Sequence, residues 1–276
     1  MLKEKLLAQL AALGPAPDYQ RFAAEVLGIH GASSTLARTL VQQALVMEDR
    51  RERWRQVGER AICEAPAAPG VYVFRDWSGR VLYVGKAVNL RRRLAAHFAD
   101  RRWRTLPPAM AGVTAVEWLR VGSEIEALLR EAILIRDLRP VVNVQTAAPT
   151  FGARAIPASL VRDVVLLVPS SDSDAAQIVA ARTDGATLLQ RTARCGADLA
   201  RHSRQLWKFF RAPACAPGDN SAALVFSWLA NRGQRTTRVH PRDVGSVPEL
   251  RRLLGQLLAD KDLFSERLVA TPVPRS

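Results

Sequence analysis

The stretch GVYVFRDWSGRVLYVGKAVNLRRRLAAHF, residues 70–98, decides the fold of the central part of the chain. Its segment GVYVFRD meets the segment RVLYVGK through Trp77-Ser78-Gly79-Arg80, in which Ser78-Gly79 is typical of a tight turn. The two segments therefore predict a β-hairpin, and the residues after them predict a helix.

The register of this hairpin brings aromatic side chains together. It places Phe74 opposite Tyr83 and Tyr72 opposite Gly85, and because side chains alternate between the two faces, the three aromatic residues share one face. An aromatic cross-strand cluster is the simplest interpretation. The other interpretation is a functional site, because two phenols lie beside a glycine that lets another backbone segment or a ligand come close.

The helix after the hairpin carries an arginine on its inward side. At 3.6 residues per turn, Leu90, Leu94 and His97 form the apolar stripe, and Arg93 falls between them. A buried cation without a partner is costly, so Arg93 is expected to be paired or to face a ligand. Phosphate is a natural ligand for the guanidinium fork.

A second helix is predicted in GSEIEALLREAILIRDLRPVVNV, residues 122–144. Ser123 and Glu126 form a capping box at its beginning, and the Arg139-Pro140 step ends it. The helix dipole favours Glu124 and Glu126 in the first turn, so the sequence assigns these two carboxylates no further purpose.

Glu131 does not fit this helix as a surface residue. Its carboxylate is expected to be paired with arginine, protonated, or bound to a metal cation. A salt bridge to Arg93 and a single hard divalent ion that completes its shell with water and phosphate oxygens remain the two main alternatives. With the phenols and the cations, the second alternative suits phosphodiester hydrolysis. The neighbours of Glu131 one helical turn away are all apolar: Ala127, Leu128, Leu134 and Ile135.

Composition points to a polyanionic partner. Among 276 residues, Lys and Arg number 40 against 26 Asp and Glu, which gives a net charge of +14. Nucleic acid is the first expectation and an anionic membrane the second, while a bias toward arginine on solvated surfaces is the bland alternative. A membrane role is disfavoured, because no apolar run approaches ~20 residues and no basic amphipathic helix has an aromatic face.

The cysteines indicate the compartment. Cys63, Cys195 and Cys215 are far apart and form no CxxC pair, so they predict neither a zinc site nor a disulfide framework. They suit a reducing cytoplasm, and the expected location is cytoplasmic and nucleoid-associated.

Residues 1–60 are expected to be helical. One helix ends near Gly14, another covers residues 18–27, and a third runs from Ser33 or Ser34 to about Arg55. The second and third helices, with the GIHGASS turn between them, predict either a DNA-binding helix-turn-helix or an ordinary helical hairpin. The third helix is expected to use Leu36, Leu40, Ala44 and Leu45 as its apolar stripe and to leave EDRRERWR (48–55) solvated, and EAPAAPG (64–70) is expected to be a linker. The candidate DNA contacts in this region are Arg38, Arg50, Arg51, Arg53 and Arg55.

Residues 158–276 predict a separate α+β region of unknown role, in which gripping DNA or a protein partner is the open expectation. VVLLVPS predicts a buried strand, and Asp184-Gly185 predicts the turn of a hairpin. A helix with Leu199, Leu206 and Phe210 follows. The last helix begins at a capping box of Ser246 and Glu249.

Several of these residues together resemble a known family. GVY (70–72), YVG (83–85), Lys86, Arg93, Glu131 and the RPVVNV ending with Asn143 are similar to the GIY-YIG nucleases, in particular to the amino-terminal nuclease domain of UvrC-like excinucleases, which cuts DNA 3′ to a lesion. The resemblance covers about residues 66–146. It implies an α+β fold: a small three-stranded antiparallel sheet flanked by helices, with residues 113–121 as the third strand.

The resemblance also implies roles for individual residues. Tyr83 would be the general base, Tyr72 would orient the nucleophile or the phosphate, and Glu131 would bind one Mg²⁺ or Mn²⁺. Arg93 would stabilise the transition state, Lys86 would assist on the phosphate side, and Asn143 would support the site. The residues expected to contact nucleic acid are Lys86, Asn89, Arg91, Arg92, Arg93 and His97.

The sequence thus predicts a metal-dependent DNA endonuclease that cuts one strand, in repair, with DNA and a repair protein as partners and an open oligomeric state. The helicase-binding hairpin and the RNase H-like domain of the excinuclease are not recognisable after Asn143. Two alternatives remain: a non-catalytic DNA-binding or scaffold protein on a nuclease fold, and a nuclease of a mobile element or a defence system.

Overall fold

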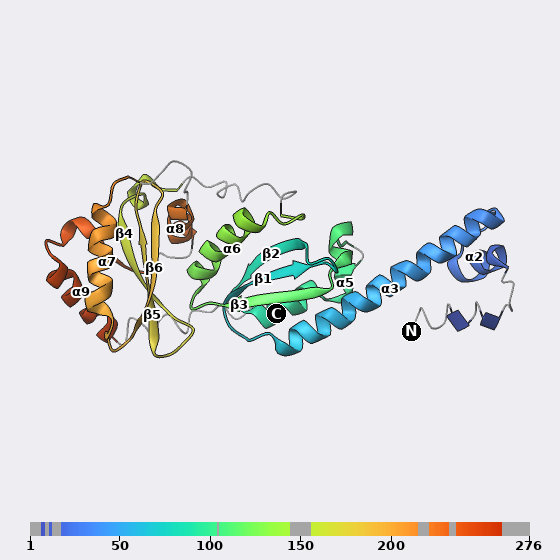
Figure 1. Cartoon of the computed structure of the whole chain (residues 1–276), viewed down its shortest axis with the longest axis horizontal. Coiled ribbons are helices and arrows are strands. Elements are labelled where there is room, and N and C mark those ends of the chain that lie inside the picture. Colours follow the sequence, from blue (N-terminus) through green and yellow to red (C-terminus); the bar gives the residue numbers. More distant parts are fainter. Residues whose placement is uncertain are drawn as a thin grey trace.

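The structure is a computed structural model that describes part of the chain. It is an elongated α+β molecule in which two antiparallel sheets follow one another, with helices α6 (Glu124–Leu138) and α8 (Ser221–Asn231) between them (Figure 1). A long helix, α3 (Ser34–Glu64), leads from the first sheet to α2 (Tyr19–Leu27) at the far end. The described residues are 7, 8, 11, 12, 18–103, 105–143, 156–214, 221–231 and 236–260.

The first sheet has three antiparallel strands in the order β2 (Val81–Ala87), β1 (Gly70–Arg75), β3 (Ala115–Arg120). The predicted hairpin register is confirmed, since Tyr72 pairs with Gly85 and Phe74 with Tyr83. The predicted third strand is confirmed too, and it adds to the free edge of β1.

The turn of the hairpin is fixed by local chemistry. Gly79 has a φ of 82°, a left-handed conformation that favours glycine. The Asp76 carboxylate accepts hydrogen bonds from the backbone N–H groups of Ser78 and Arg80, at 2.9 and 3.0 Å. The Gly79 N–H donates to the Asp76 carbonyl at 3.0 Å, so the central residues of the turn are Trp77 and Ser78, one residue earlier than the predicted Ser78-Gly79, and the strand register shifts after Phe74.

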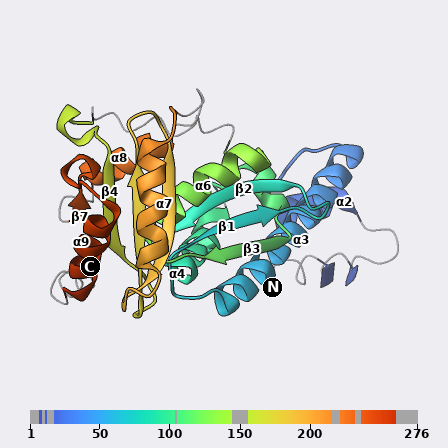
Figure 2. The same ribbon diagram turned by 60° about the vertical axis from the view of Figure 1, so that its left-hand side comes forward.

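Helices cover both faces of the first sheet. On one face lie α4 (Leu90–His97) and the carboxyl half of α3, and the core between them contains the aromatic side chains of the hairpin. On the other face lies α6, over a smaller core of valines. Figure 2 shows this arrangement from a second side. The shorter elements nearby are α5 (Asp100–Trp103) and a 3-10 helix (Pro108–Gly112).

The third predicted helix differs from its prediction in two ways. Ser33 caps it as expected, but the helix continues to Glu64, and the buried residues of its first half are Ala37 and Val41, while the predicted Leu36 is 50% exposed. The physical cause is the docking of α2, whose Phe22 and Ala23 form one buried cluster with Ala37 and Val41. Of the predicted stripe, Leu45 does pack against this cluster. The predicted helix ending near Gly14 lies almost entirely outside the described residues.

The carboxyl half of α3 belongs to the core of the first sheet. Trp54, within the segment predicted to be solvated, is only 3% exposed and packs on Phe98 with ring centroids 4.3 Å apart. The predicted linker at 64–70 is likewise packed: Ala65 is buried, and the carbonyls of Pro66 and Ala68 accept from the N–H groups of Arg91 and Leu90. The connection at 64–70 separates α3 from β1 as predicted, whereas the prediction for Trp54 was wrong because its apolar partner, Phe98, is distant in sequence.

The second sheet has four antiparallel strands, β6 (Thr187–Ala193), β5 (Ala175–Ala181), β4 (Val164–Pro169) and β7 (Thr237–Val239), in that order. The predicted buried strand and the Asp184-Gly185 hairpin are confirmed. The chain also forms β7 and α8, which were not predicted: three residues are too few for a strand pattern, and the apolar α8 has no clear polar face.

Helices flank the second sheet on both sides. One face carries α7 (Leu199–Arg211) and α9 (Val247–Ala259), and the other faces α6 and α8. The Ser246 and Glu249 capping box of α9 is formed as predicted. Two short 3-10 helices complete the region, Ala158–Leu160 and Pro241–Asp243.

Helix α6 joins the two sheets into one packed body. Its Ile125 and Leu129 lie in the core of the second sheet, whereas Ala127 packs on the first. Gln177 of β5 donates to the Glu126 carboxylate and accepts from the Ser123 hydroxyl. Glu126, which the sequence explained by the helix dipole alone, is therefore also part of the contact between the sheets.

None of the helices in the described parts of the chain combines the length and the apolarity needed to cross a bilayer. Cys63 and Cys195 are exposed free thiols, and Cys215 lies outside the described residues.

Candidate active site

Tyr72 lies at the centre of the candidate site and is completely buried. Its ring packs 5.2 Å from Phe74 and 6.0 Å from Tyr83, between centroids. It also occupies the space over Gly85, where an added Cβ would lie 2.5 Å from Tyr72 Cζ and 2.8 Å from Tyr83 Cε1. The glycine of the hairpin is thus required by the tyrosine opposite it.

The Tyr72 hydroxyl joins two side chains of α4. Arg93 Nε donates to it at 3.3 Å, and His97 Nε2 lies 2.6 Å away. An arginine can only donate, so the hydroxyl accepts from Arg93 and is free to donate its own proton to His97. Burial lowers the pKa of His97 to about 4, which leaves its imidazole neutral and able to accept at neutral pH.

This network fixes the protonation of Tyr72. Burial, and then the neighbouring Tyr83, raise the pKa of the Tyr72 phenol far above its ordinary value, although Arg93 opposes the rise. Tyr72 therefore remains a neutral phenol. Tyr83 is partly exposed, and its ring lies 5.7 Å from that of His97.

Arg93 is only partly the inward cation that the sequence predicted. Its side chain is exposed, as are those of Arg91 and Arg92, and it reaches inward through the hydrogen bond to Tyr72. Asn89 caps α4 by accepting from the Arg92 N–H at 3.0 Å, and Arg91 Nε donates to the Ala65 carbonyl at 2.9 Å. The exposed guanidinium groups remain predicted DNA contacts.

Glu131 reaches the edge strand β2 from α6. Its Oε1 accepts from the backbone N–H of Lys86 at 2.8 Å. Burial raises the pKa of the Glu131 carboxyl, and the charge and N–H of Lys86, followed by the charge of Arg93, oppose the rise. Within the described residues Glu131 forms no ion pair, so the salt bridge to Arg93 that the sequence left open is not formed.

Lys86 has a partner that the sequence did not identify. Its Nζ lies 3.9 Å from Oε1 of Glu124, a carboxylate that was explained by the helix dipole alone. The pairing depends on how α6 crosses β2, and nothing in the local sequence signals it.

Asn143 holds the outer edge of β2. Its side-chain amide accepts from the Val84 N–H and donates to the Val84 carbonyl, both at 2.9 Å, as a neighbouring strand would do. The N–H groups of Val141 and Val142 also donate to β2, at the carbonyls of Val81 and Leu82. Asn143 thus supports the strand that carries Tyr83 and Lys86.

The part of the chain that carries this site matches known proteins. The family described as the UvrC-like GIY-YIG domain matches residues 68–144. The chain contains a UvrC-like GIY-YIG nuclease domain. Among curated relatives, the UvrABC system protein C of Renibacterium salmoninarum is 50% identical over 84 residues, and that of Paenarthrobacter aurescens is 51% identical over 84 residues. Each alignment covers 29% of this chain and 12–13% of the relative, so the chain spans about an eighth of their length.

The solved structures include the GIY-YIG N-terminal endonuclease domain of UvrC from Thermotoga maritima, bound to its catalytic divalent cation, magnesium. The two sequences are 31% identical, the match covers 30% of this chain and 92% of that one, and the TM-score is 0.27.

The GIY-YIG domain offers Glu131 as a carboxylate ligand for a divalent cation. Among the residues that the structure describes, Glu131 Oε2 has no hydrogen-bond partner, and no group of three or more His, Cys, Asp or Glu side chains could enclose a metal. A single carboxylate fits Mg²⁺, which keeps several waters and shares phosphate oxygens, better than a metal that demands a full protein cage. The residues present therefore fit one ion of this kind.

Proposed function

We propose that this chain is a DNA endonuclease that cuts one strand with the help of one Mg²⁺ or Mn²⁺, leaves 3′-hydroxyl and 5′-phosphate ends, and acts in DNA repair. The observation that carries the proposal is that strand β2 joins two clusters within the GIY-YIG domain. Tyr72, which accepts from Arg93 of α4, pairs with Gly85. The next residue of β2, Lys86, donates its N–H to Glu131 of α6.

The roles follow from where each side chain lies. Glu131, held by the Lys86 N–H, would bind the cation, which supplies charge neutralisation for the scissile phosphate. The exposed end of Arg93 would contact a non-bridging phosphate oxygen and stabilise the charge that develops there. Lys86 would assist on the phosphate side.

The two tyrosines have different tasks. Tyr72 is buried, neutral and hydrogen-bonded on both sides, which suits a residue that positions Arg93 rather than a base. Tyr83 is partly exposed and lies on the same face, so it is the phenol that could take a proton from the attacking water. This assignment agrees with the role that the family resemblance implies for Tyr83.

The test is the cleavage of end-labelled plain, nicked, branched and lesion-containing duplexes with Mg²⁺ or Mn²⁺. We expect metal-dependent incision, reduced by about 100-fold or more in Glu131→Gln. Glu117→Gln is the matched control, because Glu117 lies on β3 and pairs with Arg75 away from the site. Binding of uncleaved DNA should persist in both variants.

The duplex that is cut fastest distinguishes a repair enzyme from a nuclease of a mobile element or a defence system. A preference for lesion or branched duplexes supports repair, and a requirement for one DNA sequence would instead indicate a mobile-element or defence nuclease. Intact binding with no incision on any duplex would contradict the enzyme and favour a scaffold. A repair protein as partner and a cytoplasmic, nucleoid-associated location belong to the same proposal.

A further inference from the structure

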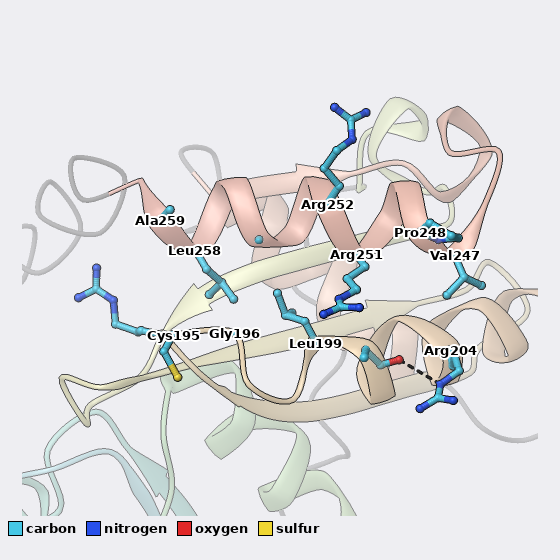
Figure 3. A pocket seen from close by; sticks show the side chains of 13 residues that line it. Cys195, Gly196, Leu199, Arg204, Val247, Pro248, Arg251, Arg252, Leu258 and Ala259 are labelled. Atoms are coloured by element: carbon cyan, nitrogen blue, oxygen red, sulfur yellow. Dashed lines mark hydrogen bonds between the residues drawn. The ribbon is translucent and has the colours of Figure 1, made fainter.

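A groove lined with arginines runs between α7 and α9 on the outer face of the second sheet (Figure 3). Its volume is about 820 Å³, and its lining includes Arg194, Arg204, Arg251 and Arg252 but no acidic residue. Arg251 points between the two helices and Arg252 away from α7. Leu199 and Leu258, which are both buried, give the groove an apolar floor.

The charge continues along α7. Arg204, Lys208 and Arg211 are three or four residues apart, so they form one stripe on the helix. Arg201 beside them pairs with Asp198, at 3.4 Å. Across the described residues, Arg204, Lys208, Arg211, Arg251 and Arg252 form no ion pair, so their charges are available to a polyanion.

An aromatic hollow adjoins the groove. Its volume is about 380 Å³, and Trp207, Phe210 and Arg211 of α7 line it together with Arg242. The one acidic side chain among the described residues that line it, Asp163, accepts hydrogen bonds from the N–H and hydroxyl of Thr183. The Arg211 guanidinium lies 3.3 Å from the centroid of the Trp207 ring, which gives a flat, cationic surface. Because Trp207 follows Arg204 by one helical turn, the groove and the hollow are neighbours along α7.

This face is separate from the GIY-YIG site. The side chains of α7 and α9 pack on one face of the second sheet, whereas α6, which carries Glu131, packs with the other face. The described residues of α7 and α9 include no exposed large hydrophobic side chain, which disfavours insertion into a membrane.

We propose that the outer face of α7 and α9 binds a single strand of nucleic acid. The arginines of the groove contact successive phosphates, and the Arg211–Trp207 stack receives one base. Single-stranded nucleic acid fits because binding sites for it combine a cationic groove with stacking surfaces, and because the bases of a duplex are not open to stacking.

The first test measures how the full chain, carrying Glu131→Gln and without divalent ions, binds a fluorescein-labelled oligothymidylate of about 20 residues, long enough to span a site of the usual size. Arg204→Ala, Arg251→Ala and Arg252→Ala are combined in one variant. We expect its affinity to fall by about 10-fold or more, and the slope of log K against log salt to fall by about 2, since each lost phosphate contact removes about 0.7. The control combines Arg21→Ala, Arg136→Ala and Arg162→Ala, which remove the same charge outside the groove.

The second test separates bases from phosphates. An abasic oligomer of equal length keeps the phosphates, so the parent is expected to bind oligothymidylate about 5-fold or more tightly than the abasic strand. Arg211→Lys keeps the charge but loses the flat guanidinium, and it should abolish this preference without changing the salt slope.

Either of two results would overturn the proposal. One is equal binding by the triple groove variant and the control triple, once urea unfolding shows that both are folded. The other is a groove variant that loses binding to phosphatidylserine vesicles but not to the oligonucleotide. Neither result depends on DNA cleavage, so these binding tests and the cleavage test of the endonuclease proposal can fail independently of one another.

Discussion

At the scale of single residues, the candidate site depends on the hydrogen bonds that the buried hydroxyl of Tyr72 makes. Tyr72 accepts from Arg93 and donates to His97, so its hydroxyl is fully used although it is removed from water. A buried hydroxyl without such partners would be costly. The bond from Arg93 Nε holds this side chain against Tyr72, while the residue as a whole remains exposed to a ligand.

The residue-scale prediction concerns His97. Its pKa is lowered from 6.5 to about 4 in the folded chain, chiefly by burial and then by the charges of Arg93 and Arg102. The unfolded chain binds a proton that the folded chain does not, so stability is full above pH 6.5 and is lost as pH falls toward 4. The contribution is about 3 kcal/mol, at about 1.36 kcal/mol for each pH unit.

The measurement is urea unfolding at about pH 7.5 and about pH 4.5, on either side of the ordinary histidine pKa, for the parent and for His97→Gln, whose amide can still accept from Tyr72. The variant should lose less stability between the two pH values, because it lacks the titrating group. An equal loss in both proteins would show that other groups cause the acid sensitivity.

At the scale of elements, a glycine inside a long helix allows α3 to approach α4. A Cβ on Gly58 would lie 2.6 Å from Cβ of Phe98, so the two helices could not stay in place. Gly58→Ala improves helix propensity, yet we expect it to lower the free energy of unfolding by about 1–3 kcal/mol through the clash.

Gly255→Ala in α9 is the matched control for this prediction. There the added Cβ meets Leu199 Cδ1 at 3.7 Å, an ordinary contact. This change should raise the free energy of unfolding by about 0.5–1 kcal/mol. Urea unfolding of both variants measures the contrast, and a stabilising Gly58→Ala would mean that α3 does not pack on Phe98.

At the scale of the whole molecule, α6 couples the GIY-YIG domain to the second sheet. Ile125 is completely buried in the core of the second sheet, and the next turns of the same helix carry Glu131 to β2. Ile125→Ala should cost about 3 kcal/mol and increase amide hydrogen exchange in β1 as well as in β4. Ile133→Ala, on the same helix but 36% exposed, should have a much smaller effect. Faster exchange in β4 alone would indicate that the two sheets unfold independently.

Much of the domain follows from local sequence. The alternation of side chains determines which residues of the hairpin share a face, and the pairs Tyr72 with Gly85 and Phe74 with Tyr83 were predictable, although the turn itself lies one residue earlier than predicted. Capping residues likewise determined where α6 and α9 begin, because their hydrogen bonds involve residues only three positions apart.

Contacts between distant segments were decided by the tertiary structure alone. Leu36 and Val41 both suit an apolar stripe, and only the docking of α2 selects Val41. The local sequence predicts that Trp54 is solvated, but in the folded chain it packs on Phe98. Glu131 accepts from the Lys86 N–H only because α6 crosses β2. The sequence by itself determined the hairpin, the helix starts and the kinds of side chain at the site, because these depend on neighbours within a few residues. Only the tertiary structure decided the partners of those side chains, because burial and hydrogen bonding across elements depend on the packing of the whole chain.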